Sequence, residues 1–177
     1  ISQSYTTGTV EATGNNVGGL AGSAAGEIQN SHAGCDVKGN NNVGGLAGNA
    51  TSAISGSTAT GYIEGKNIVG GLVGSTTGTV QKSGANGTVK GEGITGGLIG
   101  QHNVTPGTDV IIEESYSQST ILSGNPKGGL IGHTTAPYQP AVYGLIDPDD
   151  PESGLEIKVP EEKGTKVKDC YATNGLV

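Results

Sequence analysis

The stretch Gly18-Gly19-Leu20-Ala21-Gly22 decides the fold, because its pattern of two glycines, a leucine, a small or aliphatic residue and a glycine occurs five times. The other copies are Gly44-Gly45-Leu46-Ala47-Gly48, Gly70-Gly71-Leu72-Val73-Gly74, Gly96-Gly97-Leu98-Ile99-Gly100 and Gly128-Gly129-Leu130-Ile131-Gly132. The leucines are 26 residues apart in the first three steps and 32 apart in the last. A fixed period of this length is typical of stacked repeats, in which each unit buries a core only together with its neighbours. The sequence therefore predicts a solenoid.

The composition favours an ordered chain with a thin core. The 177 residues include 34 glycines, no Met, Phe or Trp, and only 3% aromatic residues. Glycine recurs in register with Leu, Val and Ile, a pattern that a disordered linker has no reason to show. The chain has no Arg, and its net charge of −7 argues against a nucleic-acid partner, which requires a basic surface. No run of about 18 apolar residues is present, so we expect no membrane span in this fragment.

Three further columns of residues recur at fixed distances from the leucines. Ile or Val follows each of the first three leucines by eight residues, a serine comes three residues later, and a second aliphatic residue comes six residues after the serine. The columns are Ile28, Ile54 and Val80; Ser4, Ser31, Ser57, Ser83 and Ser115; and Val10, Val37, Ile63, Val89 and Ile121, with Ile1 and Ile112 as outer members of the first. From the serine to the second aliphatic residue, small and polar residues alternate as in a strand. We predict an all-β, parallel β-solenoid (β-helix) of about five 26-residue coils plus a partial sixth.

The rest of each unit predicts a second strand and a corner. The Gly-Gly-Leu-x-Gly phrase is interpreted as a short strand whose leucine fills the core and whose glycines allow close backbone approach. Five residues before each leucine stands Asn or Gly, which tolerate a left-handed backbone, so we predict a left-handed corner there. This column contains Asn15, Asn41, Asn67, Gly93 and Asn125. Two residues after this column stands valine in the first three units (Val17, Val43 and Val69), which is replaced by Thr95 and Lys127 in the last two.

Two insertions interrupt the period. Six extra residues between Leu98 and Ile112 predict a surface loop around Gln101 to Val110, and 29 extra residues separate Leu130 from Val167. The chain is therefore divided into solenoid repeats (1–135), a Pro-rich acidic insertion (136–164) and the start of a further coil (165–177). In that last part Val167 and Cys170 continue the aliphatic and serine columns. Because solenoids need end caps and none is evident, we expect flanking domains of a longer parent protein.

One copy of the repeat resembles a known motif. Ile112-Glu113-Glu114-Ser115-Tyr116, followed by Gly128-Gly129-Leu130-Ile131-Gly132, is similar to the glycine- and leucine-rich GLUG motif of bacterial secreted and surface proteins, and the resemblance covers about 135 of the 177 residues. In that family the repeats occur in the non-catalytic part of immunoglobulin A peptidases and in adhesin-like proteins. The resemblance implies an extracellular or cell-surface β-solenoid and carries no catalytic residues with it.

Candidate metal ligands and cysteines give no clear site. His102 and His133 follow their leucines by four and three residues in adjacent coils, but a metal site needs a third ligand and none recurs there. We therefore predict two exposed loop histidines, and no metal or cofactor. Cys35 and Cys170 fall in distant repeats, too far apart for a disulfide, and are predicted to be free thiols.

Two groups of acidic residues are candidates for a calcium site or a catalytic carboxylate pair. The run Asp147 to Glu152 lacks the spaced ligands of a calcium loop, so a solvated acidic turn is favoured. Asp109, Glu113 and Glu114 are paired carboxylates of the kind that a polysaccharide-acting β-helix enzyme uses. Such enzymes set acids among basic and aromatic residues, which are scarce in this chain. We therefore expect no enzymatic activity.

The tyrosines are the remaining candidates. Tyr5, Tyr116 and Tyr171 share the column after the serine, on the outward face, where aromatic rings can stack on sugars or pack against a protein. The candidate ligand-binding residues, which combine this column with the insertion, are Tyr116, Tyr138, Tyr143 and Tyr171. The sequence thus predicts a stalk or adhesive segment of a bacterial surface or secreted protein, with a module that binds a host glycan or protein as the alternative.

Overall fold

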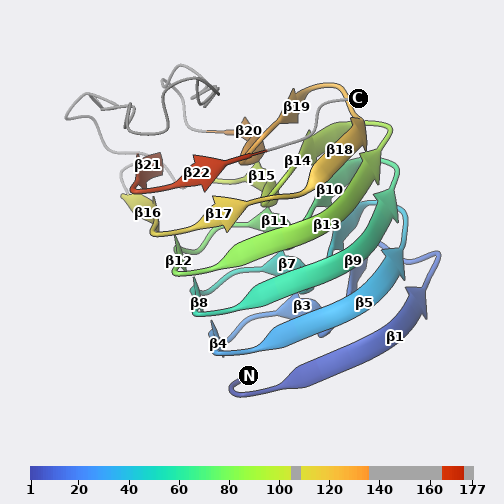
Figure 1. Ribbon diagram of the computed structural model, residues 1–177, viewed down its shortest axis with the longest axis horizontal. Helices are drawn as coiled ribbons and strands as arrows, with labels where there is room; N and C mark the ends of the chain where they lie inside the picture. Colours follow the sequence, from blue (N-terminus) through green and yellow to red (C-terminus); the bar gives the residue numbers. More distant parts are fainter. Residues whose placement is uncertain (105–108, 136–164, 174–177) are drawn as a thin grey trace.

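The chain winds into stacked coils whose strands form four parallel sheets, as the computed structural model shows (Figure 1). The structure describes residues 1–104, 109–135 and 165–173, and these residues contain strands, turns and bends but no helix. Three of the sheets contain one strand from each of five coils, stacked in chain order. The prediction of an all-β, parallel β-solenoid is confirmed.

Each sheet collects the equivalent strands of successive coils. The long sheet contains β1 (Tyr5–Glu11), β5 (His32–Lys38), β9 (Thr58–Gly65), β13 (Gly84–Gly91), β17 (Tyr116–Ser117), β18 (Thr120–Ser123) and β22 (Tyr171–Ala172). The second sheet contains β2 (Asn16–Gly18), β6 (Asn42–Gly44), β10 (Ile68–Gly70), β14 (Ile94–Gly96) and β19 (Lys127–Gly128). The third contains β3 (Ala21–Ala24), β7 (Ala47–Ala50), β11 (Val73–Thr76), β15 (Ile99–His102) and β20 (Ile131–Thr134). The fourth contains β4 (Ile28–Gln29), β8 (Ile54–Ser55), β12 (Val80–Gln81), β16 (Val110–Glu113) and β21 (Thr165–Lys168).

Equivalent residues lie directly over one another. The backbone N–H of Leu46 donates to the carbonyl oxygen of Leu72 at 2.8 Å, and the N–H of Leu72 donates to that of Leu98 at 2.9 Å. The aliphatic column after the leucines stacks in the same way, with Ile54 in register with Val80. The predicted leucine and isoleucine ladders are therefore confirmed.

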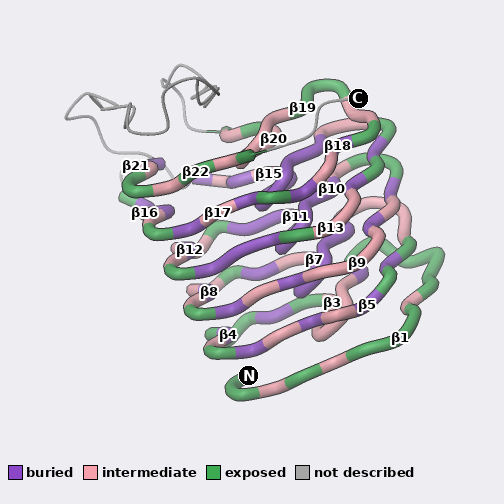
Figure 2. The backbone as a smooth tube through the Cα atoms, viewed as in Figure 1, coloured by how far each residue is buried: buried purple, intermediate pink, exposed green. Residues whose placement is uncertain are grey.

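The interior is divided into two apolar clusters. The larger one contains the leucine and isoleucine columns together with small residues of the long sheet such as Ala59. The smaller one contains Val43 and the other valines of the second sheet, packed against Val37 and Ile63 of the long sheet. Many residues of the middle coils are buried, whereas much of the first coil is exposed (Figure 2). Each coil therefore obtains its burial from the coils on either side of it.

The Gly-Gly-Leu-x-Gly phrase is a bend between two strands, so its prediction as one short strand was wrong. The first glycine ends a strand of the second sheet, the next residue and the leucine form the bend, and the fourth residue begins the third sheet. A Cβ added at Gly44 would lie 2.6 Å from the backbone nitrogen of Gly74 in the next coil. One added at Gly45 would lie 2.7 Å from Ala59 Cβ and 3.3 Å from Ile63 Cδ1. Since Ala59 and Ile63 belong to different clusters, this close backbone approach is what separates the two parts of the interior.

The left-handed corner lies elsewhere than predicted. Positive φ occurs in the residue directly before each member of the serine column, Cys170 included, with values of 47–56°, and not in the asparagine column. The residues concerned are Gln3, Asn30, Gly56, Lys82, Glu114 and Asp169. The asparagines instead form an amide ladder, in which Asn41 Nδ2 donates to Asn15 Oδ1 and Asn67 Nδ2 donates to Asn41 Oδ1. Asparagine is used in that column because its side chain bonds to its own copy in the next coil.

The serine column holds the left-handed corners in place. The backbone N–H of Ser31 donates to Ser57 Oγ at 3.1 Å, and Ser57 Oγ donates to the carbonyl oxygen of Ser55 at 2.9 Å. Ser57 is fully buried, so its hydroxyl satisfies polar backbone groups on both sides of the corner. Cys170 occupies the equivalent position in the last coil, where its thiol donates to the carbonyl oxygen of Lys168 at 3.2 Å.

The two insertions fall mostly outside the described residues. The loop predicted around Gln101 to Val110 begins later than expected, because Gln101 and His102 still belong to β15, and residues 105–108 are not described. The Pro-rich acidic segment 136–164 also lies outside the described residues. Residues 165–173 return to the stack, where Val167 pairs with Ile112 as its spacing predicts.

Leu72→Ala removes a fully buried side chain from the middle of the stack. We expect a loss of about 2–5 kcal/mol in the free energy of unfolding, because the coils above and below prevent the cavity from collapsing. Denaturant titration followed by circular dichroism measures this loss. Leu122→Ala, at a side chain that is 40% exposed, is the control and should lose much less. Equal unfolding midpoints for Leu72→Ala and the parent chain would show that the leucine column is not the core.

Gly70→Ala tests the close backbone approach in the bend. The added Cβ would meet the carbonyl oxygen of Val73 and lie 2.6 Å from the backbone nitrogen of Gly100, so we expect a loss of about 3 kcal/mol or more. Gly26→Ala is the matched control, since a Cβ at Gly26 meets nothing within 4 Å, and it should change stability by about 0.5 kcal/mol or less. Thermal unfolding of the two variants compares them. Similar melting temperatures would contradict a backbone-tight bend.

Candidate functional site

An outward column of the long sheet carries most of the aromatic residues that the structure describes. The column is in register through all coils, and its members are Tyr5, His32, Thr58, Gly84, Tyr116 and Tyr171. These side chains alternate with the buried ones and so project from the sheet. The outward column predicted for the tyrosines is present, with a threonine and a glycine in its middle.

Tyr116 and Tyr171 form a stacked pair at one end of this column. Their ring centroids are 5.5 Å apart and their planes are inclined by 11°. A Cβ added at Gly84 would lie within 2.7 Å of the Tyr116 ring, so the ring covers the bare backbone of Gly84 in the coil below. Tyr116 is half-buried between these neighbours, while Tyr171 is 44% exposed. In this tyrosine pair, Tyr116 and Tyr171, the ring of Tyr171 is therefore the one more exposed to solvent.

A second stacked pair lies at the opposite end of the column. The rings of Tyr5 and His32 are 5.3 Å apart and inclined by 17°. His32 Nδ1 lies 2.8 Å from Thr58 Oγ1, which orients the imidazole along the column. Tyr5 is 68% exposed. Stacked aromatic rings with exposed surface can pack against an apolar sugar face or a protein side chain.

The structure brings together only half of the predicted site residues. Tyr116 and Tyr171 meet, as described above, because the coil formed by residues 165–173 returns to the register of the serine column. Tyr138 and Tyr143 lie outside the described residues. Their participation in a shared ligand site remains a prediction.

His102 is buried, so its prediction as an exposed loop histidine was wrong. It has no exposed surface, and its Nδ1 lies 2.7 Å from Thr165 Oγ1. Burial lowers the pKa of the His102 imidazole from 6.5 to about 4, against a smaller opposing effect of the Gly78 backbone. His102 follows its leucine by four residues, in the interior column of Ala50 and Thr76. The four-residue spacing from the leucine, which His102 shares with Ala50 and Thr76, is the sequence signal that identifies it as an interior residue.

His133 does not lie beside His102 in the stack. It is exposed, as predicted, and pairs in register with Gln101 instead. Within residues 1–104, 109–135 and 165–173, no three His, Cys, Asp or Glu side chains gather as a metal site would require.

The candidate carboxylates bond to side chains of neighbouring coils. Glu113 Oε1 accepts a hydrogen bond from Gln81 Nε2 at 2.8 Å, and Asp109 Oδ2 lies 2.9 Å from Lys166 Nζ. Glu114 lies 3.9 Å from Lys82 Nζ. These contacts place the three acids on the surface as links between coils.

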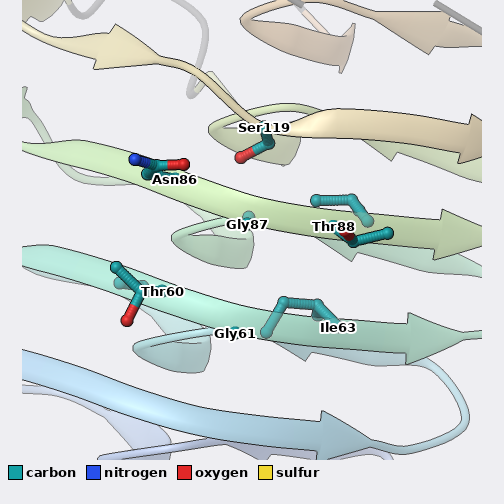
Figure 3. A pocket seen from close by; sticks show the side chains of 10 residues that line it. Thr60, Gly61, Ile63, Asn86, Gly87, Thr88 and Ser119 are labelled. Carbon is teal, nitrogen blue, oxygen red and sulfur yellow. The ribbon is translucent and has the colours of Figure 1, made fainter. Parts of the chain in front are cut away.

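A shallow crevice lies between β9 and β13, lined by Thr60, Gly61, Asn86, Thr88 and Ser119 among others (Figure 3). It has no room for a molecule the size of water. A broader, open recess of about 670 Å³ lies at the corners after β1 and β5, beside Glu11, Lys38 and Lys66. Its volume is in the range of ligand pockets, but its lining contains no aromatic or large aliphatic side chain.

Both cysteines are free thiols, as predicted. Cys35 is buried in the smaller apolar cluster. Burial raises the pKa of the Cys170 thiol, against weaker opposing hydrogen bonds from the backbone of Ser115 and Lys168. A thiol with a raised pKa is protonated at neutral pH and is a poor nucleophile. Cys170 occupies the position of the column serine, and its thiol donates to the carbonyl oxygen two residues before it, as the serine hydroxyls do.

Among the residues that the structure describes, none belongs to a helix that is long and apolar enough to cross a membrane. Comparison of the chain with protein family models, with curated proteins and with solved structures finds no match.

Proposed function

We propose that this chain is a non-catalytic stalk or adhesive segment of a larger bacterial protein that is secreted or held at the cell surface. The observation that carries the proposal is the vertical stack, in which the first five coils are joined by parallel backbone pairing in four sheets and residues 165–173 continue the pairing in two of them. Such a stack extends by adding coils without changing its cross-section, which suits a spacer. The resemblance of the repeat to the GLUG motif supports the extracellular setting.

The described side chains support a structural role over a catalytic one. The serine and asparagine ladders and the carboxylate contacts all join one coil to the next, so the polar groups that recur are used within the fold. Catalytic sites instead gather titratable groups with strongly shifted pKa values in a cleft. His102 has such a shift, but its imidazole has no exposed surface that a substrate could reach.

The proposal is tested by assays of turnover and binding on the intact chain. Incubation with a panel of polysaccharides, followed by analysis of released sugars, should give no products above the blank. A stalk should also bind nothing on an array of glycans and extracellular proteins. Sugar release that is lost in Glu113→Gln or Glu114→Gln would contradict the non-catalytic assignment.

The tyrosine pair favours a second candidate function, a module that binds a host glycan or protein. Tyr116 and Tyr171 form a stacked aromatic pair at the end of the long sheet, and Tyr171 is 44% exposed. Stacking of an apolar sugar face on such a ring contributes about 0.5–1.5 kcal/mol beyond buried area, by analogy with aromatic pairs. The deletion of residues 136–164 should abolish binding if that segment completes the site.

If the array identifies a ligand, Tyr171→Ala should weaken its binding by about tenfold, since the variant removes the exposed ring of the pair. Tyr5→Ala, which removes an exposed ring from the opposite end of the same column, is the matched control and should leave the affinity unchanged. Titration calorimetry with the identified ligand measures both. Equal affinities for Tyr171→Ala and the parent chain would place the binding site elsewhere.

A further inference from the structure

His102 links two sheets across the interior of the solenoid. Its imidazole projects from β15, and its Nδ1 lies 2.7 Å from Thr165 Oγ1 on β21. Thr165 Oγ1 lies a further 3.1 Å from Thr134 Oγ1 on β20. This polar chain is buried at His102, which has no exposed surface, and at Thr165, which is 8% exposed, whereas Thr134 is half-buried.

The coil that contains Thr165 is joined to the preceding coil by a small number of described interactions. Residues 165–173 pair with β16 and β17, with Val167 opposite Ile112 and Tyr171 opposite Tyr116. Their surface contact with the solenoid includes the ion pair between Lys166 and Asp109. Within the described residues this coil pairs in two sheets, whereas a middle coil pairs in all four, and an element with fewer such contacts opens at a lower free energy. Its buried polar contact through Thr165 is therefore well placed to control attachment.

We propose that His102 is an acid-sensitive clasp, which holds the coil formed by residues 165–173 when the imidazole is neutral and releases that coil when the imidazole is protonated. Because Tyr171 lies on the coil, release also separates Tyr171 from Tyr116. The clasp does not depend on the proposed function, since it concerns attachment of the coil and not what the solenoid binds.

The geometry explains why protonation is unfavourable in the closed form. A neutral imidazole needs one donor and one acceptor contact, whereas a protonated one donates from both nitrogens. The contact of Nδ1 with Thr165 satisfies one nitrogen, and Nε2 is buried without a hydrogen-bond partner. A charged ring would thus place a second N–H donor and a full charge inside the interior, where the Gly78 backbone offsets only part of the cost. Burial accordingly lowers the pKa of His102 to about 4.

The elements packed around His102 offer no charge that would offset a protonated ring. β11 has no titratable side chain, His133 of β20 is exposed, and Glu113 of β16 bonds to Gln81. On β21, Lys166 pairs with Asp109 and Lys168 with Asp169, all with partly exposed side chains. None of these groups contributes to the pKa shift of His102, which arises from burial and the Gly78 backbone.

The sign and window of the effect follow from the two pKa values. Attachment is fully present above pH 6.5, the ordinary pKa of the released imidazole, and is lost as the pH falls toward about 4, the pKa in the closed form. The opening equilibrium should therefore rise about 20-fold between pH 7 and pH 5.

Hydrogen exchange of the intact chain, measured by mass spectrometry at pH 7 and pH 5 and corrected for intrinsic exchange rates, tests the proposal. Peptides from residues 165–173 should show the roughly 20-fold increase in opening, while peptides from β9 show none. His102→Thr, which introduces the residue type of Thr76 and Thr134 in the same column, should remove the pH response. His133→Asn and Asp109→Asn are matched controls that should keep the response, the second with more opening at both pH values.

A second measurement covers the case in which His102→Thr fails to hold the coil at pH 7. Nuclear magnetic resonance titration of the parent chain should show the His102 ring neutral at pH 5.5 in the closed form. Equal exchange of residues 165–173 at both pH values would overturn the proposal. A pH response that persists in His102→Thr, or a His102 ring that becomes protonated near pH 6.5 while the coil stays attached, would do the same.

Discussion

Backbone hydrogen bonds between equivalent residues of adjacent coils are the constraint on which the rest of the structure depends. The N–H of Leu46 reaches the carbonyl oxygen of Leu72 only if both coils follow the same path. Each position must then be filled by a residue that fits above and below its own copies. This requirement explains why the buried positions repeat as columns of Leu, Ile or Val, Ser and Gly, and why a single coil has no stable fold of its own.

The close backbone approach in the Gly-Gly bend determines what kind of core the chain can have. At Gly45 the bend contacts both Ala59 and Ile63 of the long sheet, so the interior becomes two narrow clusters with no space for a large aromatic ring. The absence of Phe and Trp from the sequence agrees with this geometry. Buried serines then supply the hydrogen bonds that the left-handed corners require, such as the bond from the Ser57 hydroxyl to the carbonyl oxygen of Ser55.

Residues outside these columns are free to differ between coils, and they carry the features that distinguish one part of the solenoid from another. The outward column changes from Tyr5 to Thr58 to Gly84 without disturbing the stack. The stacked pair of Tyr116 and Tyr171 exists because Gly84 leaves room for one ring and the returning coil supplies the other. His102 likewise occurs beside the point where the regular period is interrupted. Local departures from the repeat, and not the repeat itself, are therefore the places where binding or regulation can arise.

The sequence by itself determined which residues are equivalent, because the 26-residue spacing is unaffected by how the chain bends. It predicted the leucine and isoleucine ladders, the outward tyrosines, and the return of Val167 and Cys170 to their columns. Only the tertiary structure decided where the chain turns and which way some columns point. The left-handed corner precedes the serine instead of lying at the asparagines, and His102 is interior, because both depend on hydrogen bonds and packing from neighbouring coils. A period fixes which residues stack, whereas the direction of a side chain is set by what lies across the interior from it.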